Sequence, residues 1–400
     1  MTLWMRNRFL LLLLSLSLAT VCENTSRAAG QPLKERVDSL WTLANEHALY
    51  GRYAESIAVC RDLLDNYRLS GDARKSIVWL ILSDANNAGD YRLWCQYARP
   101  RYAGKPARKY YKALAAQPPQ ALSRPDRDVN VPYSVDSIFF DGKYKGRMIK
   151  VPVTIAGKEE RFLLDNGVAH FCSATETFAR EHGIRPIGAE TTVVGVAGRS
   201  SSWIGIADSL RVGELLLRNM LFLVVPDEAL HNDVASIDAI LGTGFFRTVG
   251  EMQFDNRAQT ILFPAVQQDL PANLTINGAG MHFIDGTFRG ETICFHLDLG
   301  SSTTSLNVNY YERRKEDVEA TFPADSIKSG GIGGIIQYRC YRVADPDIVL
   351  DGAHFNGDHV TVDTVDMVDD PSCEGRLGND ALLYFDRAVL NIRKMFLYFE

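Results

Sequence analysis

The sequence lacks the features of several protein classes. It contains no run of more than three lysines or arginines and its net charge is −6 at pH 7, which together argue against nucleic-acid binding. Its N-terminal apolar run, residues 9–21, is too short to span a membrane as a helix. With 46% hydrophobic and 23% charged residues, the remaining composition is ordinary for a globular chain, and 400 residues are enough for two or three domains.

Motifs of other enzyme classes are also missing. There is no Gly-x-Ser-x-Gly, His-Glu-x-x-His or phosphate-binding loop. Gly331-Ile-Gly333-Gly334 is not a dinucleotide fingerprint, because its third glycine is misplaced and no β-α-β pattern surrounds it. The eight histidines are scattered, and His170 and His296 are interpreted as packing residues rather than ligands. We therefore expect no metal and no cofactor.

Cysteine is sparse, with seven residues in the chain and six of them after Cys22. In an exported protein these could form disulfides. The plausible pairs are Cys60 with Cys95 and Cys340 with Cys373, because each pair lies within one expected domain. Connectivity cannot be read from sequence, so buried free thiols are an equal alternative.

The first 28 residues are typical of a secretory signal peptide. Arg6 and Arg8 precede the apolar run, and polar residues follow it at once. Cleavage is expected near Cys22 or after Ala28. The residues before Cys22 weakly resemble a lipoprotein box, but Val21 fits it poorly, so a soluble exported protein is favoured over a lipid-anchored one. We expect the periplasm or cell envelope as its location.

Residues 31–118 are predicted to be helical, because apolar residues recur at three- and four-residue spacing. Gly51-Arg-Tyr53 and Gly89-Asp-Tyr91 each mark a turn between two helices. These units resemble tetratricopeptide repeats, in which glycine permits the turn and tyrosine packs the pair. The resemblance implies a surface for a protein partner. A generic helical subdomain is the alternative.

Residues 119–134 are rich in proline and charge and poor in strand signals, which predicts a linker with a domain boundary near residue 125. From about residue 135 the apolar period becomes two. Strands are predicted at 148–155 and 161–165, and again around 281–284 and 291–298 with Asp285-Gly286 as the turn. Ser173-Ala-Thr-Glu176 is expected to cap a short helix that ends at His182.

Four landmarks recur in the same order in residues 135–267 and 268–400. Asp165-Asn166-Gly167 and Asp298-Leu299-Gly300 follow apolar runs and lie 133 residues apart. Each is followed by a Gly-rich segment and then by a Leu-Gly pair. These are Gly195 to Gly198 with Leu241-Gly242 in the first half, and Gly330, Gly331, Gly333 and Gly334 with Leu377-Gly378 in the second. We interpret this as an internal duplication with one aspartate per copy.

Taken alone, Asp165-Asn166-Gly167 would be an ordinary hairpin turn, and Asp298-Leu299-Gly300 a strand end. Their shared register over two halves favours the duplication. Closely spaced turn signals with one short helix per half predict a mainly β fold of two barrel-like lobes. A small all-helical region precedes these lobes.

In these landmarks the chain resembles the aspartic protease superfamily, in its pepsin-like and retropepsin-like forms. The resemblance covers about residues 135–400 and implies a catalytic dyad of Asp165 and Asp298. It further implies flap hairpins at Gly195–Gly198 and Gly331–Gly333, and Leu-Gly segments that pass behind the dyad. An extended peptide would bind in the cleft between the lobes.

The residue after each aspartate departs from the family pattern of Thr or Ser. Asn166 can still donate and accept hydrogen bonds, whereas Leu299 can do neither, so the reciprocal tie between the loops is expected to be broken on at least one side. Ser301 fits the position of a hydroxyl that orients the carboxylate, and Val168 does not. Two functions remain open: an exported aspartic endopeptidase, and an inactive peptide-binding relative.

Overall fold

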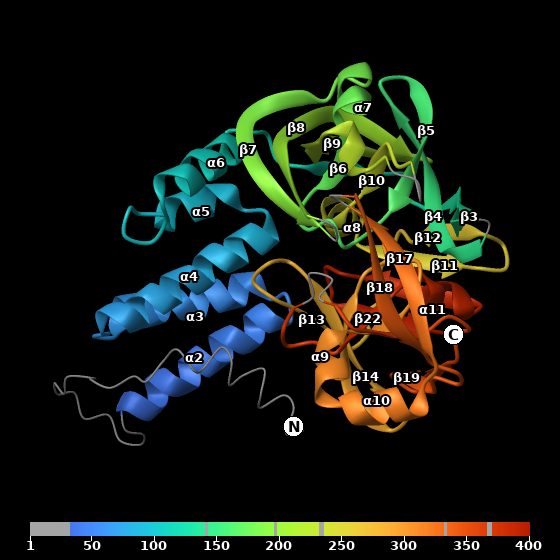
Figure 1. Ribbon diagram of the computed structural model, residues 1–400. Coiled ribbons are helices and arrows are strands. Elements are labelled where there is room, and N and C mark those ends of the chain that lie inside the picture. Colours follow the sequence, from blue (N-terminus) through green and yellow to red (C-terminus); the bar gives the residue numbers. More distant parts are fainter. Residues whose placement is uncertain (1–32, 141–142, 196–197, 232–235, 332–333, 366–369) are drawn as a thin grey trace. The chain divides into compact units, whose positions relative to one another are not determined.

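The computed structural model describes residues 33–140, 143–195, 198–231, 236–331, 334–365 and 370–400 (Figure 1). These residues pack into two compact units. The first contains the chain up to Ala115 and the short segment Ile276–Ala279, and the second contains residues 116–275 and 280–400. The division therefore falls between Ala115 and Ala116, whereas the sequence predicted it near residue 125. The expected signal peptide and Cys22 lie outside the described residues.

The first unit is helical, as the apolar spacing predicts. Its helices are α2 (Leu33–Leu49), α3 (Tyr53–Asn66), α4 (Gly71–Ala88), α5 (Tyr91–Tyr97) and α6 (Lys105–Ala115). Gly51 and Gly89 have φ of 68° and 73° and end the helices before them, a left-handed conformation that glycine adopts without a Cβ clash. Tyr53 and Tyr91 begin the next helices. Both predicted helix-turn-helix joints are therefore present.

In the second unit, the first lobe is built on a nine-stranded sheet in the order β1-β9-β6-β10-β5-β4-β8-β7, with β3 paired to β4. Its strands are β1 (Ala121–Ser123), β3 (Ser134–Phe140), β4 (Lys143–Ile155), β5 (Lys158–Leu164), β6 (Cys172–Thr175), β7 (Arg185–Gly195), β8 (Gly198–Val212), β9 (Leu215–Val225) and β10 (Ala239–Leu241). The helical segments of this lobe are α7 (Glu176–Glu181), η1 (Asp227–Ala229) and α8 (Thr243–Val249).

The second lobe is built on a ten-stranded sheet in the order β17-β18-β21-β16-β22-β15-β14-β19-β20, with β13 paired to β14. Its strands are β13 (Leu274–Ile276), β14 (His282–Phe288), β15 (Glu291–Leu297), β16 (Ser305–Leu306), β17 (Ala324–Gly331), β18 (Gly334–Arg342), β19 (Ile348–Leu350), β20 (Ala353–Phe355), β21 (Thr361–Asp363) and β22 (Gly375–Leu377). Its helices are α9 (Val308–Arg313), α10 (Lys315–Thr321) and α11 (Asn379–Tyr384).

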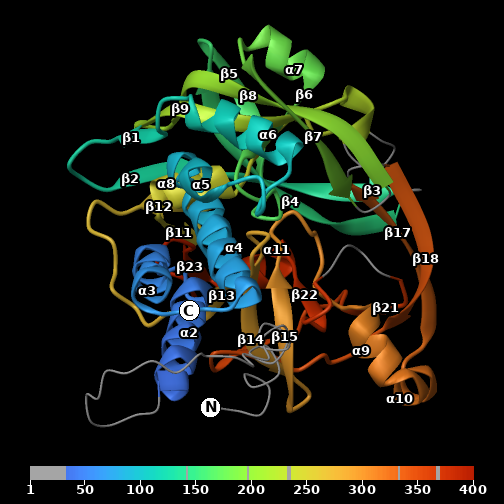
Figure 2. The same cartoon turned by 90° about the vertical axis from the view of Figure 1, so that its left-hand side faces the viewer.

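A third sheet joins the two lobes. It has the order β2-β12-β11-β23-β24, formed by β2 (Val129–Pro132), β11 (Glu251–Asp255), β12 (Thr260–Phe263), β23 (Arg387–Asn391) and β24 (Phe396–Phe399). β11 and β23 come from different halves and pair antiparallel, with Gln253 opposite Val389. Figure 2 shows this sheet between the green and the orange lobe. The last strands of each half thus form one shared sheet rather than closing two separate lobes.

Three local predictions are wrong. The segment 119–134 holds β1 and β2, because alternating buried residues there pair with β9 and β12. The second hairpin turns at Arg289-Gly290, where φ is 49° and 81°, while Asp285 and Gly286 lie inside β14. Helix α7 is capped by Thr175, whose hydroxyl accepts from the Phe178 N–H at 3.3 Å.

Ser173, the expected cap, lies in β6 and donates to the Leu223 carbonyl instead. Among the described residues no two cysteines form a disulfide, so the two disulfides considered, Cys60 with Cys95 and Cys340 with Cys373, are not present. Cys60, Cys172, Cys294, Cys340 and Cys373 are buried. Within the described ranges, no helix has the length and apolar character needed to cross a membrane.

Candidate active site: two aspartate loops

Each aspartate follows a buried strand whose backbone is held by the Leu-Gly segment of its own half. Asp165 follows β5 and donates its N–H to the Leu241 carbonyl at 3.1 Å. Asp298 follows β15 and donates its N–H to the Leu377 carbonyl at 3.0 Å. β10 and β22, which carry those leucines, pair parallel with β5 and β15. The duplication read from the sequence is therefore a repeat of backbone geometry.

The Leu-Gly segments also fit closely against the aspartate loops. A Cβ on Gly242 would lie 2.0 Å from the Phe171 carbonyl oxygen, and a Cβ on Gly378 would lie 2.8 Å from the Thr303 carbonyl oxygen. Only glycine permits backbones to approach this closely. Leu241, Gly242, Leu377 and Gly378 thus lie directly behind the two aspartates.

The two carboxyl groups face each other across the pair of loops. A Cβ on Gly300 would lie 2.4 Å from Asp165 Oδ2, and a Cβ on Gly167 would lie 2.7 Å from Asp298 Oδ1. Each glycine therefore lies against the aspartate of the other half. A side-chain hydrogen bond links the two carboxyl groups, and the loops bring Asp165 and Asp298 together as a dyad.

Burial and mutual repulsion set the electrostatics of this pair. Burial first, and then the neighbouring Asp298 charge, raise the pKa of Asp165 well above its usual range. The backbone N–H groups of Gly167 and Gly300 oppose this rise in the Asp165 pKa, and Gly167 donates to Asp165 Oδ1 at 2.7 Å. Two close carboxyls that repel each other share one proton, which belongs to the pair rather than to one residue.

Asn166 ties the two loops together from one side. Its Nδ2 donates to the Leu297 carbonyl at 2.7 Å, and its Oδ1 accepts from the Leu299 N–H at 2.8 Å. Asn166 is 2% exposed and Leu299 is fully buried, so no water competes for these bonds. The family arrangement is reciprocal, whereas here one amide makes both bonds and the Leu299 side chain contributes only packing.

The expected orienting role of Ser301 is not what the structure shows. Its hydroxyl donates to the Thr303 carbonyl at 2.9 Å, which closes its own loop instead of contacting a carboxylate. The Ser301 carbonyl accepts from the Asn379 N–H at 2.9 Å, as the Val168 carbonyl accepts from the Thr243 N–H at 2.9 Å. Ser301 and Val168 therefore occupy equivalent positions in the two halves. Each makes the same hydrogen bond with its backbone carbonyl, so this bond does not depend on the side chain.

Each half carries a long antiparallel hairpin at the predicted flap position. β7 and β8 pair up to Gly195 opposite Gly198, and β17 and β18 pair up to Gly331 opposite Gly334. Gly333 lies outside the described residues. Gly-rich ends suit a hairpin that has to bend, so both hairpins have the form that a flap requires.

Arg376 is a charged residue near the dyad that the sequence reading missed. It lies in β22, and its Nε is 3.7 Å from Asp298 Oδ2. The equivalent position in the first half, directly before Leu241-Gly242, is Ile240. Aligning the two Leu-Gly segments would have revealed this difference, because one half has an apolar residue where the other has arginine.

Three histidines of the β unit lie near one another, which the sequence also did not reveal. His282 is 3% exposed, and His296, His170 and Arg247 are near enough to act on its titration. Burial first, and then these neighbours, lower the pKa of His282 to about 3. Among the described residues, no group of three His, Cys, Asp or Glu side chains has the geometry to hold a metal.

Comparisons with known proteins point to one family. Residues 151–245 match the aspartyl protease family model. No curated protein matches the sequence. Basic 7S globulin from soybean is 12% identical with a TM-score of 0.41, over 69% of this chain and 95% of the globulin. Conglutin gamma from lupine seeds is 12% identical with a TM-score of 0.39, over 68% and 94%.

A retropepsin-like aspartic protease from Rickettsia conorii is 12% identical with a TM-score of 0.24, over 36% of this chain and 92% of the protease. The family match contains the whole first aspartate loop, from β5 through Asp165 to the Leu241-Gly242 segment. The second half repeats that loop around Asp298 with the same backbone contacts. Within the first lobe, residues 151–245 are thus similar to the aspartyl protease family.

Proposed function

We propose that this protein is an aspartic endopeptidase that hydrolyses peptide bonds with Asp165, Asp298 and an activated water. The observation that carries the proposal is the close approach of the carboxyls, in which each dyad aspartate lies against the glycine of the other loop. Two carboxyls that share one proton provide a general base and a general acid at the same site. Burial of two carboxyls that repel each other lowers the stability of the folded chain, so we infer that the pair serves catalysis rather than stability.

The reaction follows from the shared proton. The ionised carboxyl accepts a proton from water as its oxygen attacks the scissile carbonyl carbon, and the protonated carboxyl donates its proton to the carbonyl oxygen. In the second step the first carboxyl passes its proton to the amide nitrogen, the C–N bond breaks, and the other carboxyl takes a proton from the diol. One water is added, and the dyad returns to its initial state.

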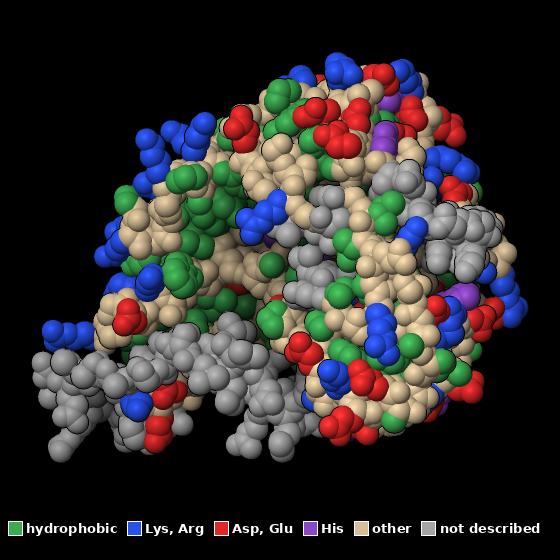
Figure 3. Space-filling view, in the orientation of Figure 1, with side chains coloured by type: hydrophobic (Ala, Val, Ile, Leu, Met, Phe, Trp, Pro, Cys, Tyr) green, Lys and Arg blue, Asp and Glu red, His purple; other side chains and the backbone are tan. Residues whose placement is uncertain are grey.

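The substrate would be an extended peptide or protein segment. A flap hairpin on each lobe could donate main-chain hydrogen bonds to such a strand and exclude water from the dyad. On the face of the β unit shown in Figure 3, acidic and basic side chains are interspersed. A mixed surface of this kind suits substrates of varied charge rather than a polyanion.

A second function, peptide binding without hydrolysis, is supported by two departures around the dyad. Leu299 has no hydroxyl, so the tie between the loops depends on Asn166 alone, and Arg376 places a positive charge 3.7 Å from Asp298. Poor orientation of a catalytic group can lower a rate by large factors while leaving binding intact. Both functions would use the same peptide site, and they differ in whether the bound peptide is cleaved.

Digestion of a peptide library between about pH 3 and pH 9, followed by mass spectrometry, separates the two functions. Endopeptidase activity predicts cleavage that is lost in both Asp165→Asn and Asp298→Asn. Asp351→Asn is the matched control, because Asp351 has φ of 47°, a conformation that asparagine tolerates. Peptide binding without turnover, equal in wild type and Asp298→Asn, would instead establish the binding protein.

The location and the helical unit are further parts of the proposal. Residues 1–28 support export by a signal peptide, with the periplasm or cell envelope as destination and Cys22 as a candidate lipid anchor. The two helix-turn-helix joints at Gly51 and Gly89 support a tetratricopeptide-like surface for a protein partner. Cell fractionation of the full chain and of Cys22→Ala tests the location, because only a lipid anchor at Cys22 would make the two fractionate differently.

A further inference from the structure

Arg376 is held at the centre of the second lobe's sheet. In β22 it is paired with His296 of β15 and with Ser305 of β16. Its side chain is 10% exposed, and Nε lies 3.7 Å from Asp298 Oδ2. A buried guanidinium is stable only near an opposite charge, because desolvation of an isolated cation costs several kcal/mol or more. Asp298 is such a partner.

The first lobe has no charge at the equivalent place. Ile240 pairs with Leu163 of β5 and with Ser173 of β6, as Arg376 pairs with His296 and Ser305. The duplicated fold therefore gives the two aspartates different surroundings. A symmetric pair of carboxyls has no preference for the position of their shared proton, whereas this pair has a cation beside one member only.

Other ionisable groups surround Arg376 on the neighbouring strands. Burial first, and then the Asp363 carboxylate, raise the pKa of Tyr338, while the Arg376 charge lowers it. Tyr338 therefore stays neutral and is close to both charges. Asp363 also accepts from the Thr361 hydroxyl at 3.0 Å, and Cys340 is its register partner in β18. His296 on β15 is a further titratable neighbour, paired in register with Arg376.

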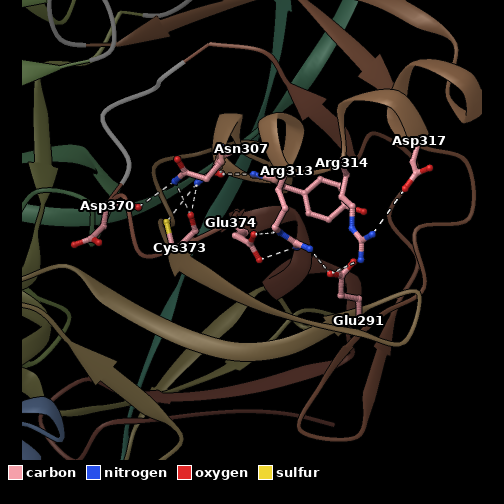
Figure 4. A network of polar contacts seen from close by, with 10 residues as sticks. Glu291, Asn307, Arg313, Arg314, Asp317, Asp370, Cys373 and Glu374 are labelled. Carbon is pink, nitrogen blue, oxygen red and sulfur yellow. Dashed lines mark hydrogen bonds and ion pairs between the residues drawn. The ribbon is translucent and has the colours of Figure 1, made fainter. Parts of the chain in front are cut away.

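The segment that leads into β22 is anchored on both sides. Arg313 of α9 forms two hydrogen bonds with the Glu374 carboxylate and an ion pair with Glu291 (Figure 4). The Glu374 N–H donates to the Cys294 carbonyl at 3.0 Å. Asn307 donates to the Cys373 carbonyl at 3.1 Å. The backbone of the segment that leads to Arg376 is therefore fixed by bonds that do not involve the dyad.

We propose that Arg376 is a positioning residue that keeps Asp298 ionised and thereby places the shared proton of the dyad on Asp165. The catalytic consequence rests on the proposed peptidase function. Asp298 would be the base that accepts the water proton, and Asp165 would be the acid that donates to the scissile carbonyl oxygen. The charge asymmetry itself does not depend on turnover and can be measured without a substrate.

Carbon-13 NMR of protein labelled at the aspartate carboxyl carbons measures where the proton lies. The two dyad resonances are assigned from their loss in Asp165→Asn and Asp298→Asn. In wild type, over the pH range in which the pair holds one proton, we expect a carboxylate shift for Asp298 and a carboxylic-acid shift for Asp165. The opposite assignment, or equal shifts for both, would overturn the proposal.

Variants of Arg376 supply the second readout. Arg376→Met removes the charge, so both apparent pKa values of the dyad should rise by about one unit or more, and the shared proton should no longer favour Asp165. Arg376→Lys keeps a positive charge and should retain most of the wild-type asymmetry. Arg387→Met, which removes an exposed arginine paired with Glu400, is the matched control. Titrations of Arg376→Met that coincide with wild type would contradict the proposal.

The two proposals fail in distinguishable ways. If no peptide is cleaved but the wild-type resonances show the proton on Asp165, the charge asymmetry holds and the peptidase function fails. If peptides are cleaved and the resonances show the proton on Asp298, the peptidase function holds and the proposed role of Arg376 fails. The wild-type measurement decides the proposal even if Arg376→Met does not fold.

Discussion

Asn166 takes part in both side-chain hydrogen bonds of the tie across the dyad, and in one of them its Oδ1 accepts from the Leu299 backbone N–H at 2.8 Å. The other bond, from Asn166 Nδ2 to the Leu297 carbonyl, is 2.7 Å long. An amide can replace the paired hydroxyls of the family because it carries a donor and an acceptor on one side chain. The loss of a hydroxyl at Leu299 is therefore compensated within the first half.

Asn166→Ala is expected to destabilise the β unit and to loosen the dyad. It leaves the Leu299 N–H and the Leu297 carbonyl buried without their partner, at a cost of about 1–3 kcal/mol each. Chemical denaturation measures this loss. Asn66→Ala, which removes an exposed asparagine bonded to Asp62, should change stability far less. Equal stabilities of the two variants would show that the tie is unimportant.

Gly300→Ala should abolish the close approach of the aspartates. The new Cβ would lie 2.4 Å from the Asp165 carboxyl, so one loop has to move. A displacement of about 1 Å can lower a rate by about 100-fold, and we expect at least that loss in peptide cleavage. At Gly71 an added Cβ meets nothing within 4 Å, so Gly71→Ala is the control. Retained activity in Gly300→Ala would place catalysis elsewhere.

The sequence predicted the parts of the fold that recur in both halves and missed the short strands that form only by pairing with distant strands of the same chain. Both aspartate loops could be found because a strand, an aspartate and a glycine recur in register. β1 and β2 were missed, since each is only a few residues long and is stabilised by β9 and β12 from distant parts of the chain. Short strands carry too little local signal to be recognised.

Side-chain roles in the candidate site were harder to predict than its backbone. Ser301 matched a motif position, but its hydroxyl bonds to Thr303 because that carbonyl is closer along its own loop. Arg376 looked like one more charged residue, since its burial beside Asp298 follows from the pairing of β22 with β15. Such roles depend on contacts between strands far apart in sequence.

Asp84 makes the helical unit sensitive to alkaline pH. Burial raises the pKa of this carboxyl from 3.8 to about 7, and the Ser56 hydrogen bond opposes that shift. The folded unit therefore holds a proton that the unfolded chain releases, so its stability is greatest below about pH 4 and is lost as the pH rises through 7. Asp84→Asn should remove this dependence and stabilise the unit at pH 8 by up to about 4 kcal/mol.

Amide hydrogen exchange of α3 and α4 in the full chain measures that change at the unit itself. Asp65→Asn is the control, because Asp65 is exposed on α3. At about pH 3 both variants should resemble wild type, since Asp84 is then mainly protonated in the folded and in the unfolded chain. Faster exchange in Asp84→Asn than in wild type at pH 8 would mean that the buried carboxyl stabilises the unit.

His282 should have the opposite effect on the β unit, making it sensitive to acid. Its folded pKa of about 3 lies below the ordinary 6.5, so the unfolded chain binds a proton that the folded chain excludes. Stability is then complete above about pH 6.5 and falls by about 1.4 kcal/mol per pH unit as the pH drops toward 3. Among the described residues, its Nδ1 has no hydrogen-bond partner to oppose this loss.

His282→Phe removes the titrating group, so the fall in Tm between pH 7 and about pH 4.5 should shrink relative to wild type. His354→Phe, at a histidine whose side chain is 65% exposed, should keep the wild-type pH dependence. If the acid sensitivity is unchanged in His282→Phe, the other acidic groups account for it. If it is lost, a peptidase built on this dyad has to work closer to neutral pH than its carboxyls alone would require, because acid unfolds the lobes that bring them together.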